Sequence, residues 1–185
     1  MSESELLMIG ISMILAAGLI KCVEGLYHAT TSQQSYWIPQ VLLWSSFIYG
    51  VCFLWGYKDN LSENPSFILY ASSVAVASTF VLRAHILATN EAAQIEDWAN
   101  HFNKVARPYF VVAALTSLST LVAASSHNEA ETTGFDAVSI SFWLGAVLNT
   151  TGAISEKVWV RGAVAVTLLI LTVLAAYVLL SNDMV

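Results

Sequence analysis

Ionisable side chains that can bind an ion lie near one end of several long apolar segments. Lys21, Glu24 and His28 are three and four residues apart, so they can share one face of a helix. Arg83 and Arg161 lie in two other apolar segments. Cations around one carboxylate can receive an anion or the headgroup of an acidic lipid, and we interpret them as a net-positive polar vestibule. The alternative is that the cations extend to the lipid headgroups and only orient the chain.

His28 and His85 are the candidates for a metal or haem site, because imidazole is a common ligand of both. The pair belongs to no recurring motif, so we predict no cofactor and leave haem or metal open. The sequence contains no nucleophile elbow, HExxH, glycine-rich phosphate loop or CxxC, and we assign no catalytic residue. Seven Lys and Arg residues are too few for nucleic-acid recognition, and we expect no such partner.

Hydroxyl and amide side chains occur in the central parts of the apolar segments, where Asp, Glu, Lys, Arg and His are absent. If the protein conducts a solute, these polar groups must line the path. The candidate pore-lining residues are Ser73, Thr79, Thr116, Ser119, Thr120 and Asn149. Ser and Thr also allow close packing of membrane helices, which is the alternative role for most of them.

The composition excludes an ordinary soluble domain. The 185 residues are 57% hydrophobic and only 11% charged, whereas a soluble domain is about a quarter charged. Six apolar segments approach the length of about 20 residues that crosses a bilayer: 6–28, 36–57, 66–88, 109–126, 135–153 and 158–180. We therefore predict an all-α fold, a single transmembrane domain over residues 1–185 built as a polytopic bundle of six helices. The fifth segment is the most polar, so five spans plus a re-entrant segment is the alternative.

Residues 91–107 predict a seventh, amphipathic helix. Apolar residues recur there at steps of three and four, and polar residues form the opposite face. Pro108 is expected to break the chain before the next span. We interpret this segment as a helix lying in the membrane interface. A short cytosolic helix packed on the bundle is the alternative.

The basic residues predict the orientation. Six spans place Lys21, Arg83, Lys104, Arg107, Lys157 and Arg161 on one side and leave Lys58 on the other. By the positive-inside rule the first side is cytoplasmic, and both termini are outside. An acidic loop with Glu129, Glu131 and Asp136 is then also outside. Cys22 and Cys52 differ in depth by about 15 Å, more than a disulfide tolerates, so both are expected to be free thiols.

The run Trp37-Ile-Pro-Gln-Val-Leu-Leu-Trp44, with Phe53-Leu-Trp55 and Leu82-Arg-Ala-His85, resembles a group of small bacterial multi-span inner-membrane proteins of undetermined role. The resemblance covers the second and third segments and rests on aromatic anchors. It implies a bacterial inner (plasma) membrane and transfers no functional residue.

Three functions remain open from the sequence. The leading hypothesis is a small oligomeric channel or transporter for a small ion or solute, entered through the cytoplasmic vestibule. Its partners would be the bilayer, anionic lipid headgroups and further copies of the chain. The second is a non-transporting subunit or scaffold of a larger membrane complex. The third is a haem- or metal-dependent membrane redox protein.

Overall fold

The computed structural model describes residues 3–59, 66–89, 92–127 and 137–182. Over these residues the chain is all-α, which confirms the all-α part of the prediction. The helices are α1 (Glu3–Thr31), α2 (Trp37–Asp59), α3 (Phe67–Leu87), the short 3-10 helix η1 (Ala92–Gln94), α4 (Trp98–His127), α5 (Ala137–Ile154) and α6 (Val158–Asn182). The acidic loop with Glu129, Glu131 and Asp136 and the side chain of Lys58 lie outside the described residues.

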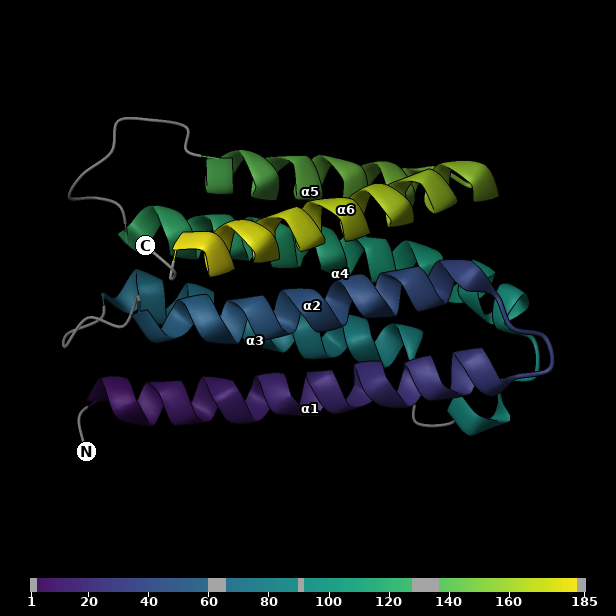
Figure 1. Ribbon diagram of the computed structural model, residues 1–185, viewed down its shortest axis with the longest axis horizontal. Helices are drawn as coiled ribbons and strands as arrows, with labels where there is room; N and C mark the ends of the chain where they lie inside the picture. The colour runs from purple at the N-terminus through teal and green to yellow at the C-terminus, as the bar shows by residue number, and fades with distance from the viewer. Residues whose placement is uncertain (1–2, 60–65, 90–91, 128–136, 183–185) are drawn as a thin grey trace.

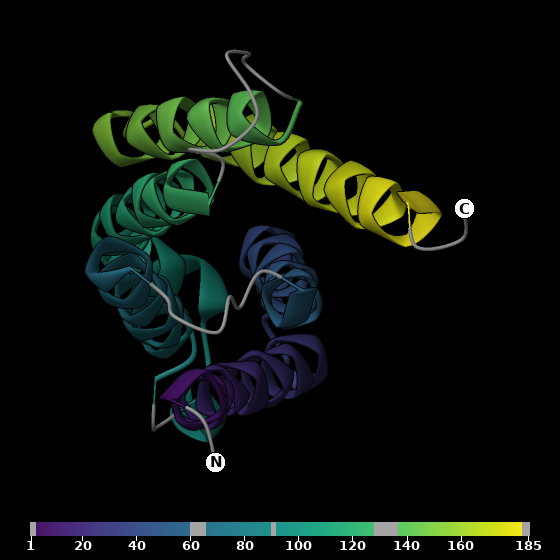
Figure 2. The same ribbon diagram turned by 90° about the vertical axis from the view of Figure 1, so that its left-hand side faces the viewer.

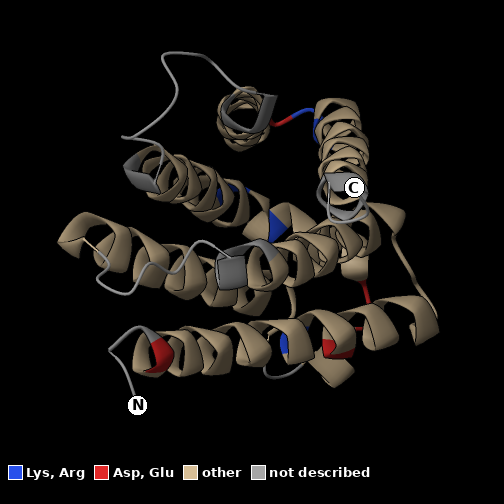
Figure 3. Ribbon diagram, turned by 60° about the vertical axis from the view of Figure 1, so that its left-hand side comes forward, with Lys and Arg blue, Asp and Glu red and all other residues tan. Residues whose placement is uncertain are grey.

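Successive long helices run in opposite directions, so both ends of the chain lie at the same end of the bundle (Figure 1). Lys21, Arg83, Lys104, Arg107, Lys157 and Arg161 all lie toward the opposite end, which we call the cationic end. Elsewhere on the described helices charged residues are sparse (Figure 3). The predicted separation of most basic residues from the termini is therefore present in the fold.

Five of the described helices are long and apolar enough to cross a membrane: α1, α2, α3, α4 and α6. The apolar part of α5, Ile140–Ile154, is shorter. The chain thus has the helices of an integral membrane protein. Five crossings follow from length and composition, and α5 would be a sixth.

The long helices form a closed ring. The most closely packed pairs are α1–α3, α3–α4, α4–α5, α5–α6, α6–α2 and α2–α1, and α2 also touches α3. Viewed from the end, α1 and α5 lie on opposite sides of this ring (Figure 2). Inward-facing side chains of helices that are not neighbours can therefore meet inside it.

Two glycines let α1 and α2 approach α3 at the same aromatic ring. A Cβ atom on Gly18 of α1 would lie 2.5 Å from Cε1 of Phe80, and one on Gly50 of α2 would lie 2.7 Å from its Cζ. Phe80 itself is fully buried. Small residues at such contacts permit the close helix packing typical of membrane bundles.

The expected break at Pro108 is wrong. Helix α4 is continuous from Trp98 to His127 with Pro108 inside it, and the described residues 92–97 before it contain the short helix η1. Membrane helices tolerate proline because neighbouring groups satisfy the freed backbone carbonyl. The sequence rule of a proline break therefore did not apply here.

The apolar stripe of the expected interfacial helix faces protein rather than lipid. Trp98, Phe102 and Ala106 are buried, while Lys104 and Arg107 on the opposite face are exposed. The ring of Phe102 lies 6.1 Å from that of Tyr36, between centroids. This agrees with the alternative of a helix packed on the bundle, here fused to the following span.

Candidate functional site: a buried arginine inside the helix ring

Arg83 lies inside the ring instead of extending to its surface. Its Cα is four residues, or about 6 Å, from the end of α3, and the residue is only 7% exposed. Its guanidinium carbon is 4.6 Å from the ring centroid of Tyr49 and 5.0 Å from that of Phe80. Tyr49 lies near the midpoint of α2. The alternative in which Arg83 extends to the headgroups does not fit this position.

The guanidinium of Arg83 is incompletely satisfied. Its Nε and Nη2 atoms are buried and have no hydrogen-bond partner. Each cation–π contact contributes about 0.5–2 kcal/mol, whereas burying an ion costs several kcal/mol even after relaxation of the surroundings. Arginine also stays protonated in proteins. The two rings therefore offset only part of the cost, and the free nitrogens call for another partner.

Two hydroxyl pairs cross the interior of the ring beside Arg83. The Ser46 and Tyr109 hydroxyl oxygens are 3.2 Å apart, and the hydroxyls of Tyr49 and Thr120 are also hydrogen-bonded. Both pairs join α2 to α4, which are not among the closely packed helix pairs. Arg83 is also close enough to Tyr109 and to Cys22 of α1 to interact with them electrostatically. Side chains from four helices thus contact the guanidinium or interact with its charge.

The predicted group on α1 is present and lies closer to the surface. Lys21 donates to a carboxylate oxygen of Glu24 at 2.6 Å, and the two side chains are 17% and 34% exposed. His28 and His85 both lie within electrostatic reach of Glu24. The structure therefore brings Lys21, Glu24, His28 and His85 into one neighbourhood, the α1 cluster. Glu24 is paired with Lys21 in this cluster.

Arg161 has a different role from the rest of the predicted vestibule. It is 7% exposed, and its Nε–H donates to the carbonyl of Gly152 at 3.4 Å. Gly152 lies in the last turn of α5, where carbonyl groups lack partners within the helix and favour a cation. Arg161 therefore caps the end of α5. It does not join the α1 cluster, because α5 and α1 lie on opposite sides of the ring (Figure 2).

The predicted pore-lining residues divide into two groups. Thr79, Thr116 and Thr120 donate to carbonyls one turn earlier in their own helices, at 2.7–2.9 Å, and Ser119 is half-buried. These bonds fit the packing alternative. Ser73 and Asn149 differ, because Ser73 Oγ and Asn149 Oδ1 are buried and have no hydrogen-bond partner. These two atoms and the Arg83 nitrogens are unsatisfied polar groups on α3 and α5.

Cys22 and Cys52 are free thiols, as predicted. Among the described residues, no group of three or more His, Cys, Asp and Glu side chains is placed to hold a metal ion. His28 and His85 are neighbours of Glu24, but their arrangement does not by itself define a metal centre.

The sequence analysis did not include Tyr49 or Tyr109 among its candidate site residues. Tyr109 is only 3% exposed, and its hydroxyl pairs with that of Ser46. A tyrosine near the centre of an apolar segment is itself a signal, because its buried hydroxyl needs a hydrogen-bond partner. Tyr49 meets that description.

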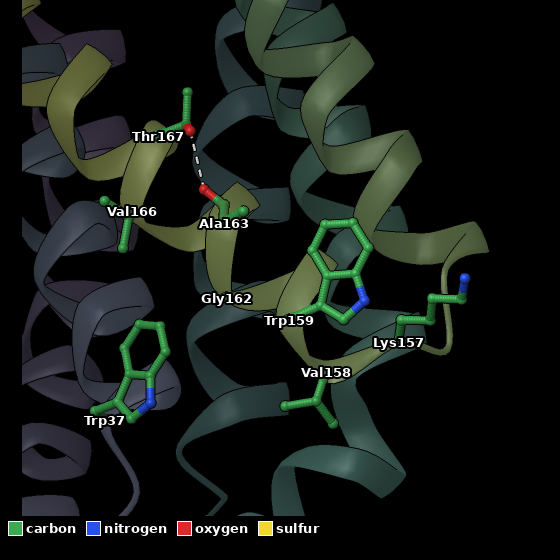
Figure 4. Close-up of a pocket in the computed structure, with 8 residues that line it drawn as sticks. All are labelled: Trp37, Lys157, Val158, Trp159, Gly162, Ala163, Val166 and Thr167. Atoms are coloured by element: carbon green, nitrogen blue, oxygen red, sulfur yellow. Dashed lines mark hydrogen bonds between the residues drawn. The ribbon is translucent and has the colours of Figure 1, made fainter.

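A shallow hollow of about 910 Å³ lies on the outer surface between α2 and α6. Trp37 and Trp159 lie on either side of Gly162 and Ala163, and Lys157 lies at one edge (Figure 4). A Cβ atom on Gly162 would lie 3.0 Å from the Trp37 ring. The hollow is apolar and separate from the Arg83 interior.

No family model, curated protein or solved structure matches the chain. The class of the protein therefore rests on its own features: an all-α ring in which five of the described helices are long and apolar enough to cross a membrane, with a buried and incompletely satisfied arginine inside it.

Proposed function

We propose that the chain is a small integral membrane channel or transporter for a small ion or solute, entered from the cationic end. The observation that supports the proposal is a set of buried polar side-chain atoms of the described helices that have no hydrogen-bond partner, among them Arg83 Nε and Nη2, Ser73 Oγ and Asn149 Oδ1. Leaving such a group unsatisfied costs about 1–3 kcal/mol, and more if it is charged. Polar groups inside membrane bundles are typical of solute pathways, because a passing solute or water satisfies them.

The polar groups extend over much of the length of α3. The α1 cluster lies toward the cationic end and would meet the solute first. Arg83 follows inside the ring. Ser73 lies ten residues further along α3, about 15 Å toward the other end. Ser73 and Arg83 would thus contact the solute at two positions along one helix. The Ser46–Tyr109 and Tyr49–Thr120 pairs lie nearby.

The proposal includes the orientation and assembly expected from the sequence. The cationic end would face the cytoplasm of a bacterial inner membrane, and the termini would be periplasmic. Anionic lipid headgroups would contact the exposed Lys104 and Arg107. The protein would work as a homo-oligomer.

One observation favours a second candidate function, a subunit of a larger membrane complex. The hollow beside Trp37 and Trp159 is an apolar surface with small residues at its base, which is a suitable contact for a helix of another polypeptide. This function predicts that the protein copurifies with other chains from its native membrane at fixed stoichiometry.

Flux through reconstituted liposomes tests the transport proposal. The purified chain is reconstituted, and the movement of common anions and cations is followed with indicator dyes. We expect one of them to pass, and Arg83→Gln and Ser73→Ala to lower its flux. Arg107→Gln is the matched control, because Arg107 is an exposed cation at the same end. Absence of flux for every ion, in wild type and variants alike, would overturn the proposal.

A further inference from the structure

The two unpartnered nitrogens of Arg83 lie on the same edge of the guanidinium. Nε and Nη2 each direct an N–H group to that side, which is the arrangement that binds an anion through two parallel hydrogen bonds. Both atoms are buried and lack a protein partner. The site therefore has two donors in a fixed geometry and no acceptor from the described part of the chain.

Among the described residues, the groups that Arg83 contacts or interacts with carry no carboxylate to compensate its charge. The rings of Tyr49 and Phe80 lie against the guanidinium carbon, and Tyr109 and Cys22, a phenol and a thiol, lie within electrostatic reach. Glu24 is two residues from Cys22 on α1, but its carboxylate is held by Lys21 at 2.6 Å. One anion with a single charge would neutralise the guanidinium.

We propose that Arg83 binds a small monovalent anion inside the ring, through Nε–H and Nη2–H. This inference names the substrate class of the proposed pathway, so its role in transport rests on that proposal. Burial among Tyr49, Phe80 and Tyr109 favours a small ion over a large one. The single positive charge of Arg83 favours an anion with one negative charge over an anion with two. Chloride, nitrate and formate meet both conditions, and formate or nitrate can use both donors at once.

Binding is tested without transport, on the full chain in detergent. A ligand that binds only the folded state stabilises it by RT ln(1 + [L]/Kd), so the unfolding temperature rises with ligand concentration. Chloride, nitrate and formate are titrated against gluconate at constant ionic strength and mildly alkaline pH, where sulfate and phosphate are both mainly divalent and serve as comparisons. Calorimetric titration of the best anion gives its stoichiometry and Kd.

We expect at least one small monovalent anion to stabilise wild type at one ion per chain, and sulfate and phosphate to stabilise it less. Arg83→Gln removes both charged donors and should weaken binding about 100-fold or more. Arg107→Gln should leave the Kd within about twofold, because exposed cations interact weakly with ions.

Three outcomes would overturn the inference: no anion-specific stabilisation of wild type, an equal effect of Arg83→Gln and Arg107→Gln, or stronger stabilisation by the divalent ions. If Arg83→Gln does not fold, Arg83→Lys replaces it and should still weaken binding, because lysine lacks the paired donors. The two proposals fail separately. Anion binding without any flux would contradict the transport proposal and leave the anion site at Arg83 supported. Flux of another ion without anion binding would contradict the anion site and leave the transport proposal supported.

Discussion

The guanidinium of Arg83 and the ring of Tyr49 form the central contact of the bundle, 4.6 Å from the guanidinium carbon to the ring centroid. The same tyrosine is hydrogen-bonded through its hydroxyl to Thr120. One side chain of α2 therefore contacts a charge on α3 and a hydroxyl on α4. Because the three helices meet at Tyr49, changes there separate the contribution of its ring from that of its hydroxyl.

Substituting Tyr49 with phenylalanine removes only the hydroxyl and its bond to Thr120. We expect the free energy of unfolding in detergent to fall by about 0.5–1.5 kcal/mol, the net value of one such bond. Tyr49→Leu also removes the ring beneath Arg83 and should lower it by a further 1 kcal/mol or so. Equal losses in the two variants, measured by denaturant titration, would show that the ring contributes nothing.

A side chain at Gly18 should disturb the packing of α1 on α3. The Cβ atom of Gly18→Ala would lie 2.5 Å from the Phe80 ring, so the ring or the helix must move. We expect a loss of about 1–3 kcal/mol in the free energy of unfolding. Gly10 is the matched control on the same helix, because its added Cβ meets nothing within 4 Å. An equal effect of Gly10→Ala would contradict the packing described for Phe80.

Phe102 tests whether the start of α4 belongs to the bundle core. The side chain is fully buried, so Phe102→Ala should destabilise the protein by about 3–5 kcal/mol. Val111 lies on the same helix and is 45% exposed, and Val111→Ala should have a much smaller effect. If Phe102→Ala leaves the unfolding temperature unchanged but weakens contact with lipid, the result would favour a helix lying in the membrane interface over a helix packed on the bundle.

The Lys21–Glu24 pair should contribute little to stability. Both side chains are partly exposed and three residues apart on one helix, where such pairs contribute about 0.2–0.5 kcal/mol. We expect Glu24→Gln to leave the unfolding temperature nearly unchanged in high salt, where screening already weakens the pair. A large loss of stability that persists in high salt would show that Glu24 has a buried partner.

Cysteine labelling in intact cells tests the orientation. In a Cys22→Ala, Cys52→Ala background, Asn103→Cys lies on the exposed face of α4 near the cationic end. A membrane-impermeant thiol reagent added outside should label it only after the cells are opened. Labelling of this position in intact cells would place the cationic end outside and reverse the topology.

The sequence predicted the features that depend on composition along one helix. Apolar length identified the six long segments that became helices, although α5 is shorter in its apolar part than the others. The depths of Cys22 and Cys52 predicted that neither forms a disulfide, and both are free. The spacing of Lys21 and Glu24 predicted their shared face, which the 2.6 Å contact confirms. Each of these follows from the rise and period of a single helix.

The sequence did not determine which neighbour each face meets. The periodicity of Trp98 and Phe102 identified an apolar stripe correctly. An apolar stripe can be buried against lipid or against protein, and the sequence of one helix does not distinguish the two. Only the order of helices in the ring placed that stripe against the bundle and turned Arg83 inward, against the ring of Tyr49. Period and composition are local properties of the chain, whereas burial of a side chain depends on helices far away in the sequence. The sequence alone thus determined the helices and the end that carries most of their basic residues, and the tertiary structure decided which polar groups lie inside.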